Sequence, residues 1–254
     1  MQRSNSQGLI VRRKKEQVMA SPPSSYRRAA LAFLIHITQE LRSRPLTKYT
    51  ALCFFGDRFL RALPARGRAW ENDREIRWIE PCKESNLQLF ALISVWIASK
   101  IHETRPIYVG SLKSISDELI TEQHFTIRDF IEAELVFMKT IHFNLRTGNI
   151  IFMCLEDLLI QFRNTAVSAK DLKSSVCLDV LDIMYESEDL CSTFLSTDIV
   201  AAAAILVVAY ILTVPRGRSE FPMIPWLKIV CRCEEEDIET LCERILMSIL
   251  QTPT

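Results

Sequence analysis

The chain has 254 residues, 48% of them hydrophobic, enough to fill the cores of one or two domains of ordinary size. Its 31 basic residues balance its 31 acidic residues. This balance argues against a protein whose main task is binding nucleic acid, because neutralising a phosphate backbone needs a basic excess. Only six glycines occur, which favours long helices over a glycine-rich β protein or a phosphate-cradling loop.

The N-terminal segment, residues 1–25, is polar and basic and has no helical hydrophobic pattern. We predict that it is a disordered tail without a signal peptide. Up to residue 28 the chain has seven basic side chains and one acidic side chain, which fits either a weak nuclear-import signal or a solvated tail.

Two helices are predicted next. The first runs from about residue 22 to Arg42, and the second starts with Thr47 as its cap and ends at Pro64. The charged segment 64–83 that follows is predicted to be a surface loop or a short exposed helix. The buried face of the second helix is expected to consist of Leu52, Phe55, Phe59 and Leu63.

The third helix, Ser85–His102, is the centre of the predicted fold. It carries no charge from Leu87 to Ser99 and has apolar residues on every side, so it is stable only when other helices surround it. Ser85 and Gln88 have the spacing of a capping box at its start.

Two further helices complete the first half of the chain. The fourth covers Ser111–Ile120, and the fifth starts with a Thr126–Asp129 capping box and reaches about His142. A charged residue, Glu134, interrupts the predicted buried stripe of the fifth helix, which consists of Ile127, Ile131, Glu134, Met138, Ile141 and Leu145.

The second half repeats this plan around another apolar stretch, Ile199–Val214. As a helix this stretch would be about 24 Å long, too short for a bilayer, so we expect it to be buried in protein. Helices are also predicted from Thr147, over Val176–Tyr185, through Trp226, and from about residue 235 to 251. The predicted fold is therefore all-α, with two tandem five-helix domains, residues 26–146 and 147–254, the second more divergent.

Three charges are not explained by this fold. Lys100 ends the uncharged central helix, Glu134 lies within an apolar stripe, and Arg28 lies at a helix N-terminus, where the helix dipole disfavours cations. Each has an ordinary explanation as a solvated or boundary charge. Together, near the ends of three helices that pack on one another, they could converge on one surface.

Four segments resemble the motifs of the cyclins, and most closely those of the J-type cyclins of plants. RRAALAFLI (Arg27–Ile35) resembles the cyclin motif MRAILVDWL, and FFGDRFL (Phe54–Leu60) is similar to YIDRFL. NLQLFALISVWIASKIHE (Asn86–Glu103) resembles LQLVG…IASKYEE, and AELVFMKTIHFNL (Ala133–Leu145) resembles MEHLVLKVLTFDL. The motifs occur in the order typical of the family.

This resemblance implies two tandem cyclin folds and a regulatory subunit that binds and activates a cyclin-dependent protein kinase during the cell cycle. It assigns Arg28, Lys100 and Glu134 to the kinase-facing surface. The implied mechanism is allosteric, because the first fold holds a mobile kinase helix and its Lys–Glu pair in the active arrangement. The resemblance implies no cofactor, no catalysis by the chain itself and a location in the nucleus or cytoplasm.

The substrate-docking patch of the family is only partly retained. Leu31 and Gln88 match the pattern, but Arg27 replaces a methionine and Leu34 replaces a tryptophan, which weakens the case for docking of Arg-x-Leu substrates. The tail has no RxxL destruction signal, and the chain has no LxCxE motif. It therefore resembles neither a typical B-type nor a typical D-type cyclin.

Other functions have less support from the sequence. The four histidines form no HExxH pattern, and no GxSxG motif or Gly-rich phosphate loop occurs. The close cysteine pair Cys231 and Cys233 lacks the further ligands of a zinc site. Two alternatives stay open: a cyclin-fold scaffold that binds DNA or other proteins, as some transcription factors do, and a degenerate cyclin that binds a kinase without activating it.

Overall fold

The fold is described from a computed structural model, in which the described residues are 24–66, 78, 83–147, 150–187, 190, 198–215 and 221–251. The regular structure in these ranges is entirely helical, as predicted. Most of the predicted tail and most of segment 64–83 lie outside the described residues. Within the described part of the chain, no helix is both long and apolar enough to cross a membrane.

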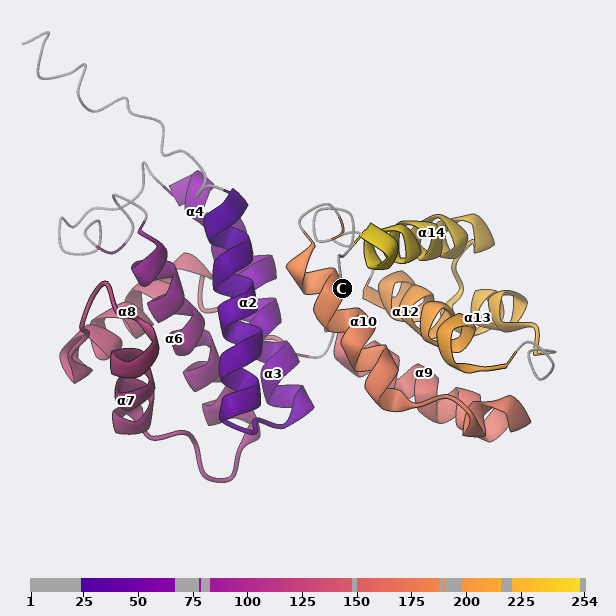
Figure 1. The fold of residues 1–254 in the computed structure, drawn as a ribbon, viewed down its shortest axis with the longest axis horizontal. Coiled ribbons are helices and arrows are strands. Elements are labelled where there is room, and N and C mark those ends of the chain that lie inside the picture. The colour runs from indigo at the N-terminus through magenta and orange to yellow at the C-terminus, as the bar shows by residue number, and fades with distance from the viewer. Residues whose placement is uncertain are drawn as a thin grey trace, which may run out of the picture.

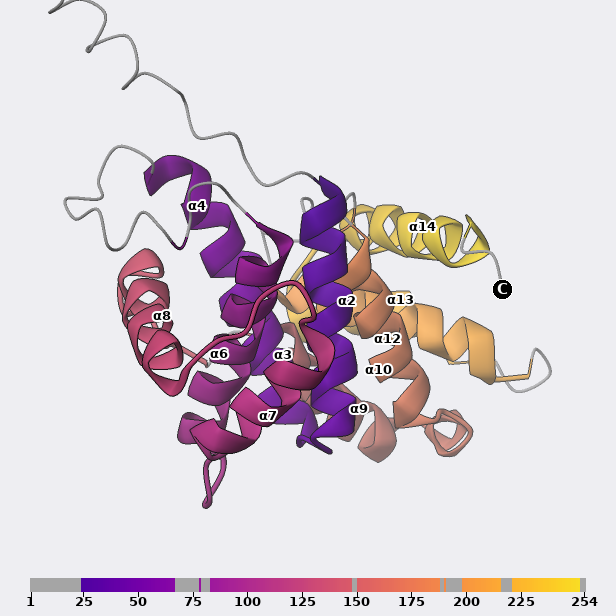
Figure 2. The same cartoon turned by 60° about the vertical axis from the view of Figure 1, so that its left-hand side comes forward.

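The first group of helices surrounds α6 (Glu84–His102), as Figures 1 and 2 show. Every α6 residue from Ser85 to Ser99 except Gln88 is buried, which confirms the prediction of an enclosed central helix. The predicted capping box at its start is wrong, because the N-cap is Lys83 and has no side-chain cap. The helices that pack on α6 are α2 (Ser24–Glu40), α3 (Pro45–Leu52), α7 (Val109–Leu119) and α8 (Ile127–Thr140).

The second predicted helix continues beyond its expected end. After α3 the chain passes without a break into a π-helical segment, η1 (Cys53–Phe59), and then into α4 (Leu60–Arg66). Its start also differs from the prediction, because Arg44 is the N-cap and Pro45, with its fixed φ angle, occupies the first turn. The predicted buried face is confirmed, with Leu52, Phe55, Phe59 and Leu63 all at most 3% exposed.

Aromatic rings connect this long helix to the rest of the first group. The Phe59 ring stacks on Phe137 of α8 with a centroid distance of 4.7 Å and lies 4.5 Å from the Phe90 ring of α6. Gly56 in η1 allows α2 to approach closely, since a Cβ atom there would lie 3.3 Å from Leu31 Cδ2. The packing therefore fixes α6 and α8 relative to each other.

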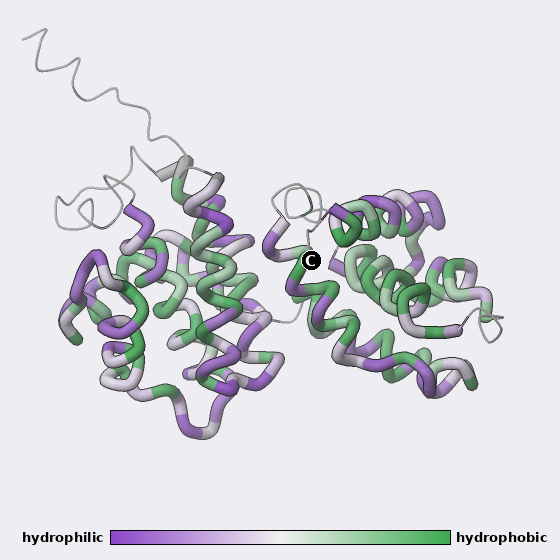
Figure 3. The backbone as a smooth tube through the Cα atoms, viewed as in Figure 1, coloured by the Kyte–Doolittle hydropathy of each residue, from purple (hydrophilic) through white to green (hydrophobic). Residues whose placement is uncertain are grey.

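The second group surrounds α12 (Asp198–Thr213), whose residues from Val200 to Tyr210 are all buried. In Figure 3, α12 is mostly hydrophobic, whereas α14 also carries hydrophilic residues on its outer face. The helices that pack on α12 are α9 (Ile151–Thr165), α10 (Ser174–Glu186), α13 (Met223–Cys231) and α14 (Glu235–Gln251); the single turn η2 (Val167–Lys170) follows α9. In the described ranges each group thus has five helices, when α3, η1 and α4 are counted as one.

The two groups meet where α2 faces α10 and α3 faces α9 (Figure 1). Lys48 Nζ lies 2.5 Å from Asp182 Oδ2, and the Tyr49 hydroxyl lies 3.0 Å from Asp182 Oδ1 and 3.1 Å from the carbonyl oxygen of Leu178. The Tyr49 ring also stacks on Phe152 at 5.1 Å. These residues join the two groups; that each group is a separate cyclin fold, with a boundary after residue 146, stays a prediction.

Candidate functional site

The candidate site lies where the last turn of α6 meets the middle of α8. Lys100 Nζ donates a hydrogen bond to Glu134 Oε1 over 2.6 Å, and the two side chains are 37% and 26% exposed. The structure thus brings together two of the three charges that the sequence singled out. Both side chains remain partly exposed although they bond each other, so the ammonium group and the carboxylate can still contact another molecule.

Arg28 does not join this pair. It is exposed near the start of α2, and among the described interactions it forms no hydrogen bond or ion pair with Lys100 or Glu134. Burial and the neighbouring Asp182 carboxylate raise the pKa of Glu186, and the positive charge of Arg28 acts in the opposite direction. The charge of Arg28 therefore acts on Glu186 of α10 rather than on the Lys100–Glu134 pair.

Its neighbour Arg27 contributes to a charge cluster that the sequence analysis missed. Arg27 Nη2 donates to the carbonyl oxygen of Gly56 over 3.5 Å, and the Tyr185 hydroxyl lies 3.4 Å from Asp57 Oδ2. Burial raises the pKa of the Asp57 carboxyl to about 6, although Arg61 and Arg27 both lower it. A carboxylate inside the apolar run FFGDRFL is the signal that could have revealed this cluster.

Exposed apolar side chains of α8 lie on the same helix face as Glu134. The predicted buried stripe is wrong at Ile127 and Ile131, which are 41% and 56% exposed, and Leu135 is 50% exposed. The helix instead buries Phe130, Ala133, Val136, Phe137 and Thr140. The α8 sequence has two apolar stripes at helical spacing, and the one with the phenylalanines removes more apolar area from water when it is buried.

Ile101, directly after Lys100, is a further apolar residue at this site and is 40% exposed. On α8, Ile131 and Leu135 lie within one turn of Glu134, and Ile127 lies one turn further towards the start of the helix. We call the ion pair and these four residues the α6–α8 surface. Exposed apolar residues that gather around polar groups are typical of protein interaction sites.

The end of α6 is fixed by the start of α3. Arg44 Nη2 donates to the carbonyl oxygen of His102 over 2.5 Å, and Thr47, which was predicted to be a helix cap, donates to Glu103 Oε1 over 2.6 Å. Thr50 Oγ1 lies 2.9 Å from His102 Nε2. These contacts hold the turn of α6 that carries Lys100.

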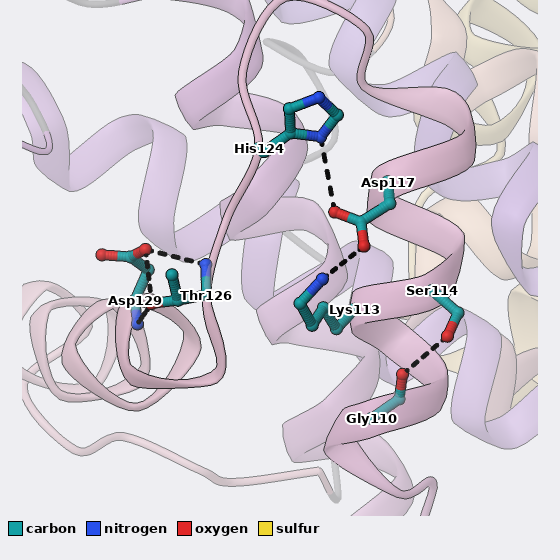
Figure 4. Close-up of polar contacts among 7 residues, drawn as sticks. All are labelled: Gly110, Lys113, Ser114, Asp117, His124, Thr126 and Asp129. Atoms are coloured by element: carbon teal, nitrogen blue, oxygen red, sulfur yellow. Dashed lines mark hydrogen bonds and ion pairs between the residues drawn. The ribbon is translucent and has the colours of Figure 1, made fainter.

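The connection between α7 and α8 is fixed by the polar contacts that Figure 4 shows. Lys113 forms an ion pair with Asp117, and His124 Nδ1 lies 3.5 Å from the other Asp117 oxygen. The hydrogen bond from Lys113 lowers the pKa of Asp117. The predicted capping box is confirmed: the Asp129 N–H donates to Thr126 Oγ1 over 3.2 Å, and the Thr126 N–H donates to Asp129 Oδ2 over 2.8 Å.

The residues of the family's substrate-docking patch are mostly inaccessible. Leu31 and Leu34 are 2% and 0% exposed, whereas Gln88 and Arg27 are partly exposed. Both leucines belong to the hydrophobic core, and Leu31 lies against Gly56 of η1. A docking peptide would therefore meet few of the apolar atoms on which this mode of binding depends.

Comparison with known proteins identifies the same family as the four sequence motifs. The family described as "Cyclin, N-terminal domain" matches residues 4–146. The chain is 45% identical over 241 residues to a protein of Oryza sativa subsp. japonica named "Cyclin-J18-like", with 91% of this chain and 90% of that protein covered. It is 44% identical over 233 residues to "Cyclin-J18" of Arabidopsis thaliana, with 91% and 98% covered. The chain therefore belongs to the cyclin family.

Proposed function

We propose that this protein is the non-catalytic regulatory subunit of a heterodimer with a cyclin-dependent protein kinase, which it binds and activates to control cell division. The observation that carries the proposal is the α6–α8 surface, in which an ion pair lies among exposed apolar side chains. A mobile amphipathic helix of a kinase fits such a surface, because it can bury its apolar face and pair its polar groups at the same time.

The Lys100–Glu134 pair supplies polar groups for the complex. An ammonium group has three donors and a carboxylate has several acceptor positions, and only one of each is used between Lys100 and Glu134. The remaining groups can bind the ends of a kinase helix. If the protein binds the active position of that helix more tightly than the inactive one, the difference in affinity shifts the kinase towards its active state.

Charge distribution disfavours the alternative of a DNA-binding scaffold. Residues 147–254 contain eight basic and sixteen acidic residues, a net charge of −8, so the second half would be repelled by a phosphate backbone. A protein that grips DNA between two folds needs basic surface on both. The proposal includes a location in the nucleus or cytoplasm, for which the support is the basic N-terminal segment. It leaves out substrate docking through Leu31 and Leu34, because both are buried.

The test is binding of the purified protein to a panel of cyclin-dependent kinases, followed by histone phosphorylation with each kinase that binds. Lys100→Met and Glu134→Gln each remove one charge of the pair and leave the other charge uncompensated in the complex. We expect each to weaken kinase binding by about tenfold or more, because truncating one member of a desolvated pair typically costs about 2–5 kcal/mol.

Lys113→Met is a matched control, since Lys113 is also 37% exposed and also pairs with a carboxylate, on α7. This variant should bind and activate the kinase like the wild type. Thermal unfolding of all variants checks that they are folded. The proposal is wrong if the wild type binds no kinase of the panel, or if Lys100→Met and Glu134→Gln bind as tightly as the control.

A further inference from the structure

Trp96 lies one helical turn before Lys100 on α6 and contacts its ammonium group. Lys100 Nζ is 3.4 Å from the centroid of the Trp96 ring and 2.6 Å from Glu134 Oε1. Lys100 is therefore held between an indole face and a carboxylate. This cation–ring distance is shorter than those of Lys48 over Tyr49, 5.3 Å, and Arg58 over Phe54, 5.0 Å.

We propose that Trp96 is a positioning residue of the kinase-binding surface, which acts by holding the ammonium group of Lys100 against Glu134. The inference rests on the proposed function and adds a residue that none of the family motifs assigns. Trp96 itself is only 9% exposed, so it has little surface to offer a partner and acts through Lys100.

The physical reason lies in the flexibility of lysine. A partly exposed lysine samples many rotamers, and fixing them on binding reduces affinity. The negative face of the indole ring attracts the ammonium group, and tryptophan does so more strongly than tyrosine or phenylalanine. The ring thus selects, in the free protein, the rotamer in which Lys100 pairs with Glu134 and presents its remaining donors.

A role in core packing alone would make a different prediction. For packing, any apolar side chain of suitable size at position 96 would serve, and leucine and phenylalanine would be comparable. For positioning, the aromatic face matters. Trp96→Phe retains an aromatic face, whereas Trp96→Leu does not. Both substitutions leave a cavity in place of the indole, so a difference between them reports the effect of the aromatic face.

The geometry is tested first, without a kinase. In protein with ¹³C-labelled lysine, the ε-methylene protons of Lys100 should resonate upfield of those of the other lysines, because they lie over an aromatic ring. Lys100→Met assigns the signal by its disappearance. The upfield displacement should be lost in Trp96→Leu and partly retained in Trp96→Phe. A Lys100 signal at the ordinary position in the wild type would overturn the inference.

Kinase affinity is then measured in a double-mutant cycle. Immobilising one long side chain changes Kd by roughly 2- to 10-fold, so Trp96→Leu should weaken binding by about that factor and Trp96→Phe by less. In the Lys100→Met background the two substitutions should have equal effects on Kd. Equal effects of both substitutions in the wild-type background would overturn the inference. Absence of kinase binding by a wild type that shows the displaced Lys100 signal would instead overturn the proposed function.

Discussion

Replacement of Asp57 by asparagine should change how the stability of the protein depends on pH. Burial raises the pKa of this carboxyl from 3.8 to about 6, Asp198 adds to the increase, and Arg61, Tyr185 and Arg27 oppose it. Between these two values the folded protein holds a proton that the unfolded chain has released. The free energy of unfolding therefore falls as pH rises through this window and is constant above it.

The magnitude follows from the shift. A difference of about two pKa units corresponds to about 3 kcal/mol over the whole window, of which about 2 kcal/mol lies between pH 4.5 and 7.5. Asp57→Asn has no such proton to lose. Its stability relative to the wild type should increase by about this amount from pH 4.5 to pH 7.5.

Urea denaturation at several pH values measures this difference directly. Asp179→Asn, which removes an exposed carboxyl from α10, controls for the loss of one negative charge. The reasoning would be refuted if the stabilities of the wild type and Asp57→Asn changed in parallel across the whole pH range. Parallel curves would mean that Asp57 has the same pKa in the folded and the unfolded protein.

Three further predictions concern the groups that hold the fold and the site together. Tyr49→Phe removes the hydroxyl that bonds Asp182 or Leu178, and we expect a loss of about 1–2 kcal/mol in urea unfolding. Phe59→Ala removes a ring stacked in the core of the first group, which should cost about 3–5 kcal/mol in the same assay. Burial lowers the pKa of His102 below 6.5, so the contribution of His102 to stability should decline as pH falls below 6.5. His102→Gln should therefore gain stability relative to the wild type over that range when thermal unfolding is followed against pH.

The burial of the two central helices could be predicted from the sequence. Apolar residues on all sides of α6 and α12 allow only a position surrounded by other helices, whatever those helices are. The Thr126–Asp129 cap was equally predictable, because it depends on residues three positions apart. Both signals depend only on residues close in sequence, so they can be recognised without knowing the tertiary contacts.

The candidate site was predictable only in part. Lys100 and Glu134 were identified from the sequence and form an ion pair, whereas Arg28, the third charge identified with them, does not join the pair. The cation–ring contact of Trp96 with Lys100 has the i, i+4 spacing that permits it, but the sequence does not indicate that the ammonium group will lie on the indole face.

The face of α8 that stays exposed was decided by the tertiary structure. Its sequence has two apolar stripes at helical spacing, and periodicity cannot rank them, since both fit a helix equally well. The stripe with Phe137 is buried because that ring stacks on Phe59, a residue 78 positions away, and the stripe with Ile127 and Ile131 is left exposed. Sequence alone determined that the chain forms amphipathic helices around two apolar helices; packing between distant residues determined which face of α8 remained exposed.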